Sequence, residues 1–394
     1  MIAWNAARVA VLFVALAPLA YYWIALLAAA RFFRGKTSAG KQPPPAQPGG
    51  FTPPVSILKP IRGLDRETYD NYASFCRQDY PEFEILFCVT DEQEPALPLI
   101  RQLIRDFPER PIRLLVGADP VGASDKVNKL CRMARESRHS ILIVSDSDVR
   151  VQSNFLRAVV APFEDPKVGG VTCLYRGRTD GSLAANLEAL GNSTDFAPGV
   201  IVARLTGGLN FMLGAVMATT SKHVEEIGGF EALADYFCDD YELGNRIARH
   251  CYRVELSRFP VEIVYPHETL ADAFRHQIRW NLSIRFSRPA GHLGLILTQG
   301  LPWALLAALV APSAGIAAGY LAGYALLRAT MAWVIGVRGM GDSLVRRRMW
   351  ILPLRDAFAF VVWLASFFPQ RIHWRDREFR VRKKRLVPLT SRRG

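Results

Sequence analysis

The sequence predicts an α/β protein in which a doubly wound, parallel sheet is joined to membrane-spanning helices. Short apolar runs alternate with helical patterns through the middle of the chain, and long uncharged blocks lie near both ends. Acidic residues follow two of the short runs, at the edge where a parallel sheet binds its ligands. These observations exclude a wholly disordered chain and predict a membrane-attached protein with a site at its sheet edge.

Residues 9–30 form the first uncharged block, which is long enough to cross a bilayer. Basic residues follow between 31 and 41, and the positive-inside rule places this flank in the cytoplasm. A cleaved signal peptide is the alternative, but it would have a shorter apolar region and a more basic start. We therefore expect a transmembrane anchor over 1–36 and, from its proline and glycine content, a linker over 37–54.

The central residues 55–290 have the length of one domain, and strand-like and helix-like segments alternate along them. The short runs are apolar throughout, as in parallel strands that helices cover on both faces. We expect strands at 55–60, 84–91, 113–117 and 141–148, and helices at 66–77, 95–107 and 126–138.

A second apolar block is long enough for two spans, at 293–311 and 314–337. A third stretch, 349–368, contains an adjacent arginine and aspartate, and a charge near the bilayer centre costs about 3 kcal/mol. If the central domain and the tail share one side of the membrane, this half of the chain crosses an even number of times. We therefore expect a hairpin and a re-entrant or interfacial segment within 291–368, followed by a basic cytoplasmic tail at 369–394.

The net charge of +13 is concentrated, since residues 370–394 hold ten basic and two acidic residues. This distribution favours a membrane surface over a nucleic-acid partner. None of the six cysteines forms a C-x-x-C pair, so a zinc or redox site has no support. The glycine-rich motifs of dinucleotide-binding and P-loop proteins are missing as well.

The segment SDSDVRV (145–151) is the most informative stretch of the chain. Asp146 and Asp148 leave a buried strand together, which brings two hard oxygen ligands near one point. Such a pair suits Mg²⁺ or Mn²⁺ bridging a diphosphate. The alternative is a solvated turn that caps the next helix. Asp91 ends an earlier strand at the same predicted edge.

Three further segments carry polar residues of possible chemical use. Asp239 and Asp240 precede a helical pattern, where they serve either as helix-capping acids or as a general base. Lys126 opens another helix, and it contacts a phosphate or lies in solvent. The segment 275–289 mixes four arginines with aromatics, which suits either phosphate and sugar binding or an interfacial helix.

In this order the motifs resemble an inverting glycosyltransferase of family 2 type with the GT-A fold. The single anchor before the domain and the few segments after it resemble the ceramide glucosyltransferase family, family 21, and its bacterial hopanoid-linked branch. The stretches FCRQDYP, VTCLYRG and IGGFEALADY strengthen this resemblance. The motif HQIRW (276–280) is similar to the Q/R-x-x-R-W motif of the family but has His276 at its first position, flanked by Arg275 and Gln277.

The resemblance implies roles for individual residues. Asp91 would lie at the uracil, and the metal would bind Asp148 with Asp146 close by. Asp240 would act as the catalytic base. Arg279 and Trp280 would position the diphosphate and the acceptor. His276 or Gln277 would complete this motif, and Lys126 would contact the nucleotide-sugar.

The implied activity is transfer of a sugar, glucose first among them, from a UDP-sugar to the hydroxyl of a membrane lipid such as ceramide. A divalent cation, Mg²⁺ or Mn²⁺, would assist, and the product would be a β-glycolipid. The expected location is the inner (cytoplasmic) membrane, crossed more than once, with the catalytic domain facing the cytoplasm. Alternatives are a hopanoid-linked N-acetylglucosaminyltransferase, a processive polysaccharide synthase and an inactive membrane-anchored binding module.

Overall fold

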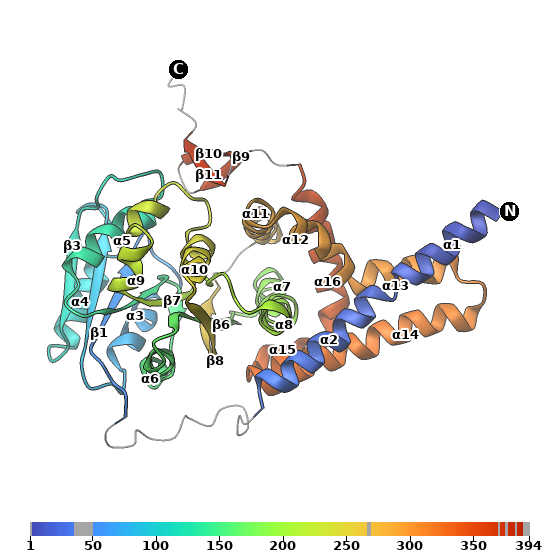
Figure 1. The fold of residues 1–394 in the computed structure, drawn as a ribbon, viewed down its shortest axis with the longest axis horizontal. Coiled ribbons are helices and arrows are strands. Elements are labelled where there is room, and N and C mark those ends of the chain that lie inside the picture. Colours follow the sequence, from blue (N-terminus) through green and yellow to red (C-terminus); the bar gives the residue numbers. More distant parts are fainter. Residues whose placement is uncertain are drawn as a thin grey trace. The chain divides into compact units, whose positions relative to one another are not determined.

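The computed structural model describes residues 2–34, 50–265, 269–368, 371–374, 377–382 and 384–388. Contacts divide the chain into two compact units, which are described separately (Figure 1). We call Lys41–Arg178, Gly207–Pro266 and Gln370–Gly394 the sheet unit. Met1–Gly40, Thr179–Thr206 and His267–Pro369 form the helical unit. The predicted domain 55–290 therefore contributes residues to both units.

The sheet unit contains an eight-stranded sheet with the order β3-β2-β1-β4-β7-β6-β8-β5. Its strands are β1 (Val55–Pro60), β2 (Phe83–Val89), β3 (Ile112–Val116), β4 (Ile141–Ser145), β5 (Val149–Arg150), β6 (Val168–Arg178), β7 (Val216–Thr220) and β8 (Arg253–Val264). The four strands predicted from the sequence are confirmed and pair in parallel around β1. The sequence did not predict β7, which pairs antiparallel to both β4 and β6.

Helices flank the strands of this sheet (Figure 1). They are α3 (Thr68–Cys76), α4 (Leu97–Asp106), α5 (Asp125–Glu136), α6 (Phe155–Val160), α9 (Ser221–Glu226) and α10 (Asp239–Arg249), with short 3-10 turns η1 (Ala161–Glu164) and η3 (Phe230–Leu233). The first three confirm the predicted helices. Every residue of β2 and of β4 is buried, which explains why these runs are mostly apolar rather than alternating.

The helical unit consists of helices of varied length. They are α1 (Ile2–Val14), α2 (Ala17–Phe32), α7 (Leu183–Gly191), η2 (Asn192–Phe196), α8 (Ala197–Gly207), α11 (Leu270–Ser287), α12 (Pro289–Gly294), η4 (Leu295–Thr298), α13 (Gly300–Val310), α14 (Ala314–Met331), η5 (Ala332–Gly339), α15 (Ser343–Arg348), η6 (Met349–Ile351) and α16 (Leu352–Ala365). Of these, α13 and α14 run side by side as the two arms of a hairpin (Figure 1).

Two of the described helices are long and apolar enough to cross a membrane, Asn5–Phe32 and Ala314–Gly339. A third span is possible by the same test if Pro289–Thr298 and Gly300–Val310, which meet at a bend of 53°, count as one. All three lie where the sequence predicts spans. The first has an irregularity between α1 and α2, just before Pro18, which has no N–H to donate to the preceding turn.

The third predicted stretch, 349–368, becomes η6 and the 14-residue helix α16. The predicted linker lies outside the described residues over 35–49. In the tail, the described residues form a three-stranded antiparallel sheet of β9 (Arg371–Trp374), β10 (Arg377–Arg382) and β11 (Arg385–Pro388). The sequence predicted a basic tail there, and no strands.

Candidate active site

The site begins at the turn after β4, where Asp146 and Asp148 are half-buried. A fully buried lysine, Lys59 on β1, holds this turn through hydrogen bonds. Its Nζ donates to the backbone oxygen of Asp146 at 2.6 Å and to Ser145 Oγ at 3.4 Å. Burial lowers the pKa of Lys59 to about 7, although the carboxylates of Asp148 and Asp146 oppose that shift. The sequence indicated this residue only as a lone lysine in an apolar strand.

Asp148 is held by its backbone, since its carbonyl accepts a hydrogen bond from Val264 N at 3.0 Å. Burial, followed by the negative charges of Asp146 and Asp65, raises the pKa of Asp148 to about 7. The turn therefore concentrates negative charge beyond what Lys59 offsets. A divalent cation fits this chemistry, because two carboxylates supply part of an oxygen coordination shell and substrate phosphates usually supply the rest.

Lys126, near the start of α5, connects this turn to a second acidic segment. Its Nζ lies 2.7 Å from Asp146 Oδ1 and 3.7 Å from Asp239 Oδ2. Burial disfavours the ammonium, but these carboxylates outweigh it and raise the pKa of Lys126, so the lysine stays charged. Ser124 caps α5 by accepting a hydrogen bond from Val127 N, which fixes where the helix begins and so where Lys126 lies.

Asp240 lies at the start of α10 and uses its two carboxylate oxygens differently. Oδ1 accepts hydrogen bonds from Tyr241 N at 2.8 Å and from Cys238 Sγ at 3.1 Å. Oδ2 faces Gly214: a Cβ at that glycine would lie 3.2 Å from Asp240 Oδ2 and 3.6 Å from Asp146 Oδ2. The two carboxylates predicted for separate roles therefore border one small space, which the glycine leaves open.

The environment of Asp240 tunes it toward accepting a proton. Burial, and next the charge of Asp239, raises the pKa of Asp240 to about 6, while Lys126 opposes the rise. The start of α10 is held in place because Met212 N donates to the backbone oxygen of Asp240 at 3.3 Å. A Cβ at Gly244 would lie 2.4 Å from Met212 N, so only glycine permits this close packing.

Asp91, the remaining predicted residue of the sheet unit, lies just beyond β2 and is exposed. Its Oδ1 accepts from Gln93 N at 2.9 Å, which closes a local turn. Because β1, β2 and β4 are parallel, Asp91 lies at the same edge of the sheet as Asp146.

The motif HQIRW belongs to α11 in the helical unit. His276 Nδ1 lies 3.0 Å from Glu188 Oε1, and Gln277 Nε2 donates to the same oxygen at 3.0 Å. The His276 ring also meets Trp280 edge to face, with ring centroids 5.0 Å apart. His276 and one of its flanking residues, Gln277, therefore converge on one acid, whereas the other, Arg275, pairs with Asp272. Arg279, the motif's arginine, is half-buried on the same helix.

Glu188 was not predicted from the sequence. It is fully buried on α7, and its Oε2 has no hydrogen-bond partner in the described part of the chain. The available signal was a single acid within the mostly apolar segment LAANLEALG, because a buried carboxylate is costly unless it has hydrogen-bond partners.

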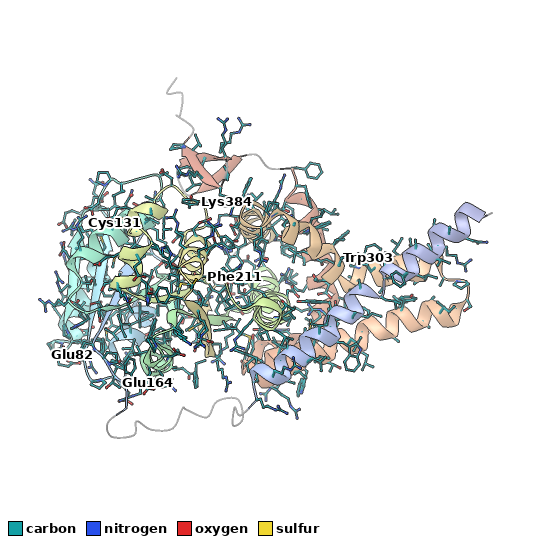
Figure 2. All side chains as sticks on the ribbon, in the orientation of Figure 1. Glu82, Cys131, Glu164, Phe211, Trp303 and Lys384 are labelled. Carbon is teal, nitrogen blue, oxygen red and sulfur yellow. The ribbon has the colours of Figure 1, made fainter. Side chains whose placement is uncertain are left out.

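The C-terminal strand β11 contacts the segment that leads into α10. Leu386 N donates to Asp235 O at 2.7 Å, and Phe237 N donates to Lys384 O at 3.0 Å. The ammonium of Lys384, labelled in Figure 2, lies 3.6 Å from Glu242 and over the ring of Tyr241. The far end of the chain thus supports the loop that carries Asp239 and Asp240.

Comparison with known proteins gives a consistent picture. A family model, glycosyl transferase family 21, matches residues 10–387. Ceramide glucosyltransferase 1 of Caenorhabditis elegans is 26% identical over 242 residues, which are 61% of this chain and 50% of that protein. The ceramide glucosyltransferase of Komagataella phaffii is 38% identical over 106 residues, 26% of this chain and 21% of that protein. The chain spans about half the length of the first of these relatives.

Among solved structures, a mannosyltransferase from Pyrobaculum calidifontis in complex with GDP-Man and Mn²⁺ matches with a TM-score of 0.50. The match covers 93% of this chain and 97% of that one, at 19% sequence identity. At this identity the likeness concerns the fold alone, and it confirms the GT-A fold predicted from the sequence.

Proposed function

Because the chain belongs to glycosyltransferase family 21, we propose that it transfers a sugar from a UDP-sugar to the hydroxyl of a membrane lipid. Glucose and ceramide are the proposed sugar and acceptor, since the matched relatives are ceramide glucosyltransferases. One observation carries the proposal: Asp240 Oδ2 and Asp146 Oδ2 border the same space above Gly214. A proton acceptor and a diphosphate-side carboxylate are needed close together for such a transfer.

In this proposal Asp240 accepts the proton of the acceptor hydroxyl as its oxygen attacks the anomeric carbon. The raised pKa of Asp240, about 6, makes its carboxylate a better base than an exposed aspartate while leaving it ionised at neutral pH. The bond to UDP breaks in the same displacement. A single in-line displacement inverts an α-linked donor, so the product is a β-glycoside.

Asp146 and Asp148 are the proposed holders of a divalent cation, Mg²⁺ or Mn²⁺. When bound, the cation would offset the negative charge that develops on the UDP leaving group. Lys126 holds one oxygen of Asp146 and keeps that side chain oriented. Lys59 holds the backbone of the same turn.

The remaining assignments extend the family resemblance to particular side chains. We assign Asp91 to the uracil, and Arg279 and Trp280 to the diphosphate and the acceptor. His276 and Gln277 are proposed to act by anchoring α11 to Glu188, since both contact its Oε1. The contact between His276 and Trp280 would then orient the tryptophan ring.

The test is transfer by the purified, full-length protein with a matrix of donors and lipids. UDP-glucose, UDP-N-acetylglucosamine and UDP-galactose would each be paired with ceramide and with a hopanoid alcohol, with GDP-mannose as a nucleotide control. We expect β-glucosylceramide, identified by mass spectrometry and by the anomeric coupling in its NMR spectrum. Transfer of N-acetylglucosamine to the hopanoid would favour the hopanoid-linked alternative. Absence of transfer from every UDP-sugar would contradict the proposal.

We also propose that the protein lies in the inner membrane with the sheet unit facing the cytoplasm. Cys251 is exposed on this unit, so it serves as a native probe. An impermeant maleimide should label it in permeabilised cells and leave it unlabelled in intact ones, with Cys251→Asn as the control for site specificity. Equal labelling in intact and permeabilised cells would mean that the sheet unit faces away from the cytoplasm.

A further inference from the structure

The helical unit contains a cavity of about 760 Å³ that the proposed transfer reaction does not use. It lies where the end of α2 meets η5 and the start of α15. Its lining residues fall into two chemical groups, an apolar wall and a set of arginines, and the two groups meet at the ends of the candidate membrane spans.

The apolar wall belongs to the spans themselves. Ala29 and Ala30 lie within the span Asn5–Phe32, while Val334 and Val337 lie within the span Ala314–Gly339. The wall therefore continues from residues that are expected to face or approach lipid chains.

Phe33 extends this wall beyond the end of α2 and packs against η5. A Cβ at Gly339 would lie 2.3 Å from a ring carbon of Phe33, so the ring needs the glycine to approach this closely. The segment that supplies the glycine is a π-helix, a form often found at functional positions within longer helices.

Three exposed arginines line the same cavity: Arg34, Arg338 and Arg346. One lining side chain, Asp342, is acidic, so the lining residues carry three positive charges and one negative charge. Its Oδ1 accepts from Leu344 N at 2.8 Å, and its Oδ2 accepts from Ser193 Oγ at 2.6 Å. The cavity is therefore positively charged at a membrane–water boundary.

We propose that this cavity binds one anionic phospholipid, with its phosphate among the three arginines and an acyl chain along the apolar wall. Guanidinium groups bind phosphate oxygens with paired, charge-assisted hydrogen bonds. Basic pockets between membrane helices are suited to acidic headgroups. A free phosphate would use the arginines but would leave the wall of Ala29, Ala30 and Phe33 without a partner. Ceramide is uncharged and has no phosphate for the guanidinium groups to bind.

The experiment compares two triple variants of the full-length protein that lose the same number of charges. Arg34→Gln/Arg338→Gln/Arg346→Gln removes the arginines that line the cavity. The control, Arg31→Gln/Arg347→Gln/Arg348→Gln, removes exposed arginines from α2 and α15 that do not line the cavity. Both proteins would be reconstituted in nanodiscs of phosphatidylcholine containing phosphatidylglycerol, and the lipid retained on extraction would be counted by native mass spectrometry.

We expect the wild-type protein and the control variant to retain one phosphatidylglycerol, and the cavity variant to retain it at least tenfold less. General attraction to an anionic surface would weaken equally in both variants, and that result would overturn the proposal. Displacement of the bound lipid by millimolar glycerol phosphate would show an anion site without a lipid site, and would overturn it as well. Circular dichroism verifies that both variants are folded. The readout needs no transfer activity, so it is independent of the proposed function.

Discussion

Two clusters of charged side chains, one in each unit, differ in how well their charges balance. The carboxylate cluster of the sheet unit has four acids and one ion-paired lysine: Asp146, Asp148, Asp239, Asp240 and Lys126. The arginine–aspartate cluster of the helical unit has two cations and two anions: Asp195, Arg328, Arg355 and Asp356. The first has negative charge in excess, and the second is neutral overall.

The arginine–aspartate cluster is densely bonded. Arg328 Nη2 lies 2.6 Å from Asp356 Oδ1, and Arg355 Nη2 lies 3.0 Å from Asp195 Oδ2. Tyr324 donates to Asp356 at 2.7 Å, and Arg328 Nη1 donates to the backbone oxygen of Thr194 at 2.6 Å. These contacts connect α14, α16 and η2 into one buried network.

The difference in balance indicates a difference in role. A buried cluster with equal numbers of positive and negative charges can specify how helices pack without an added ion. In the carboxylate cluster, burial and next the charges of neighbouring acids raise the pKa values of Asp148 and Asp240, so a cation or a proton stabilises it. The following predictions test this contrast, from the largest expected effect to the smallest.

Removing divalent cations should abolish transfer. Excess EDTA should reduce turnover to background, because it removes the cation that Asp146 and Asp148 are proposed to hold, and with it the positive charge that offsets the diphosphate. The protein should remain folded by circular dichroism, since the arginine–aspartate cluster contains its own cations. EDTA premixed with equimolar Mn²⁺ is the control. Full turnover in excess EDTA would exclude the metal role of these two residues.

Asp240→Asn should lower kcat by about 10²–10⁴-fold, because the amide cannot accept the acceptor's proton. Donor affinity should change little, and the melting temperature should hold or rise, since a carboxylate with a raised pKa is removed. Asp239→Asn is the matched neighbour and should be the milder change. A variant that keeps more than about a tenth of wild-type kcat would transfer the base assignment to Asp239.

Asp356→Asn should destabilise the helical unit by about 3–5 kcal/mol, because it leaves Arg328 buried without its main counter-charge. Thermal unfolding in detergent measures the loss. The double variant Arg328→Gln/Asp356→Asn removes the imbalance and should recover part of it. Equal instability of the single and double variants would mean that the charge pair itself is not the cause.

The pH dependence of transfer should reflect Asp240. Since its pKa is raised to about 6, the carboxylate is protonated as the pH falls through 6, and kcat/KM should drop about tenfold for each further unit. Above that value the profile should be flat. Measurements at saturating Mn²⁺ keep the titration of Asp148 out of the profile. In Asp240→Asn this fall in kcat/KM at low pH should disappear. If it persists, the titrating group is not Asp240.

Lys384→Met should have the smallest effect, with stability lowered by less than about 1 kcal/mol. Its ion pair with Glu242 spans 3.6 Å and is partly exposed, so solvent screens it. Deleting residues 371–394 should lower both stability and kcat by more than Lys384→Met does, because it also removes the backbone hydrogen bonds to Asp235 and Phe237. If Lys384→Met lowered stability and kcat as much as the deletion, the loss would come from the lysine side chain and not from the backbone hydrogen bonds.

Much of the sheet unit was predictable because its signals are local. Apolar runs that end in polar residues predicted β1 to β4, and their parallel order placed Asp91 and Asp146 at one edge. The antiparallel strand β7 was missed, because it pairs with β4 and β6, which are distant in the sequence. The strands of the C-terminal sheet pair with their sequence neighbours, and they were missed because this segment was interpreted only through its basic charge. The charges of Arg355 and Asp356 led to the prediction that 349–368 is re-entrant or interfacial, and that remains a prediction. Their ion pairs with Asp195 and Arg328 could not be predicted from the sequence.

The sequence by itself determined which residue types were available and on which elements they stand. It determined that two aspartates leave one strand, that two more open a helix, and that apolar blocks are long enough to span a bilayer. Only the tertiary structure decided that Asp240 and Asp146 border one space above Gly214, and that Lys126 bridges the two acidic segments. The physical reason is that charge balance and burial depend on neighbours in space, which no spacing along the chain specifies.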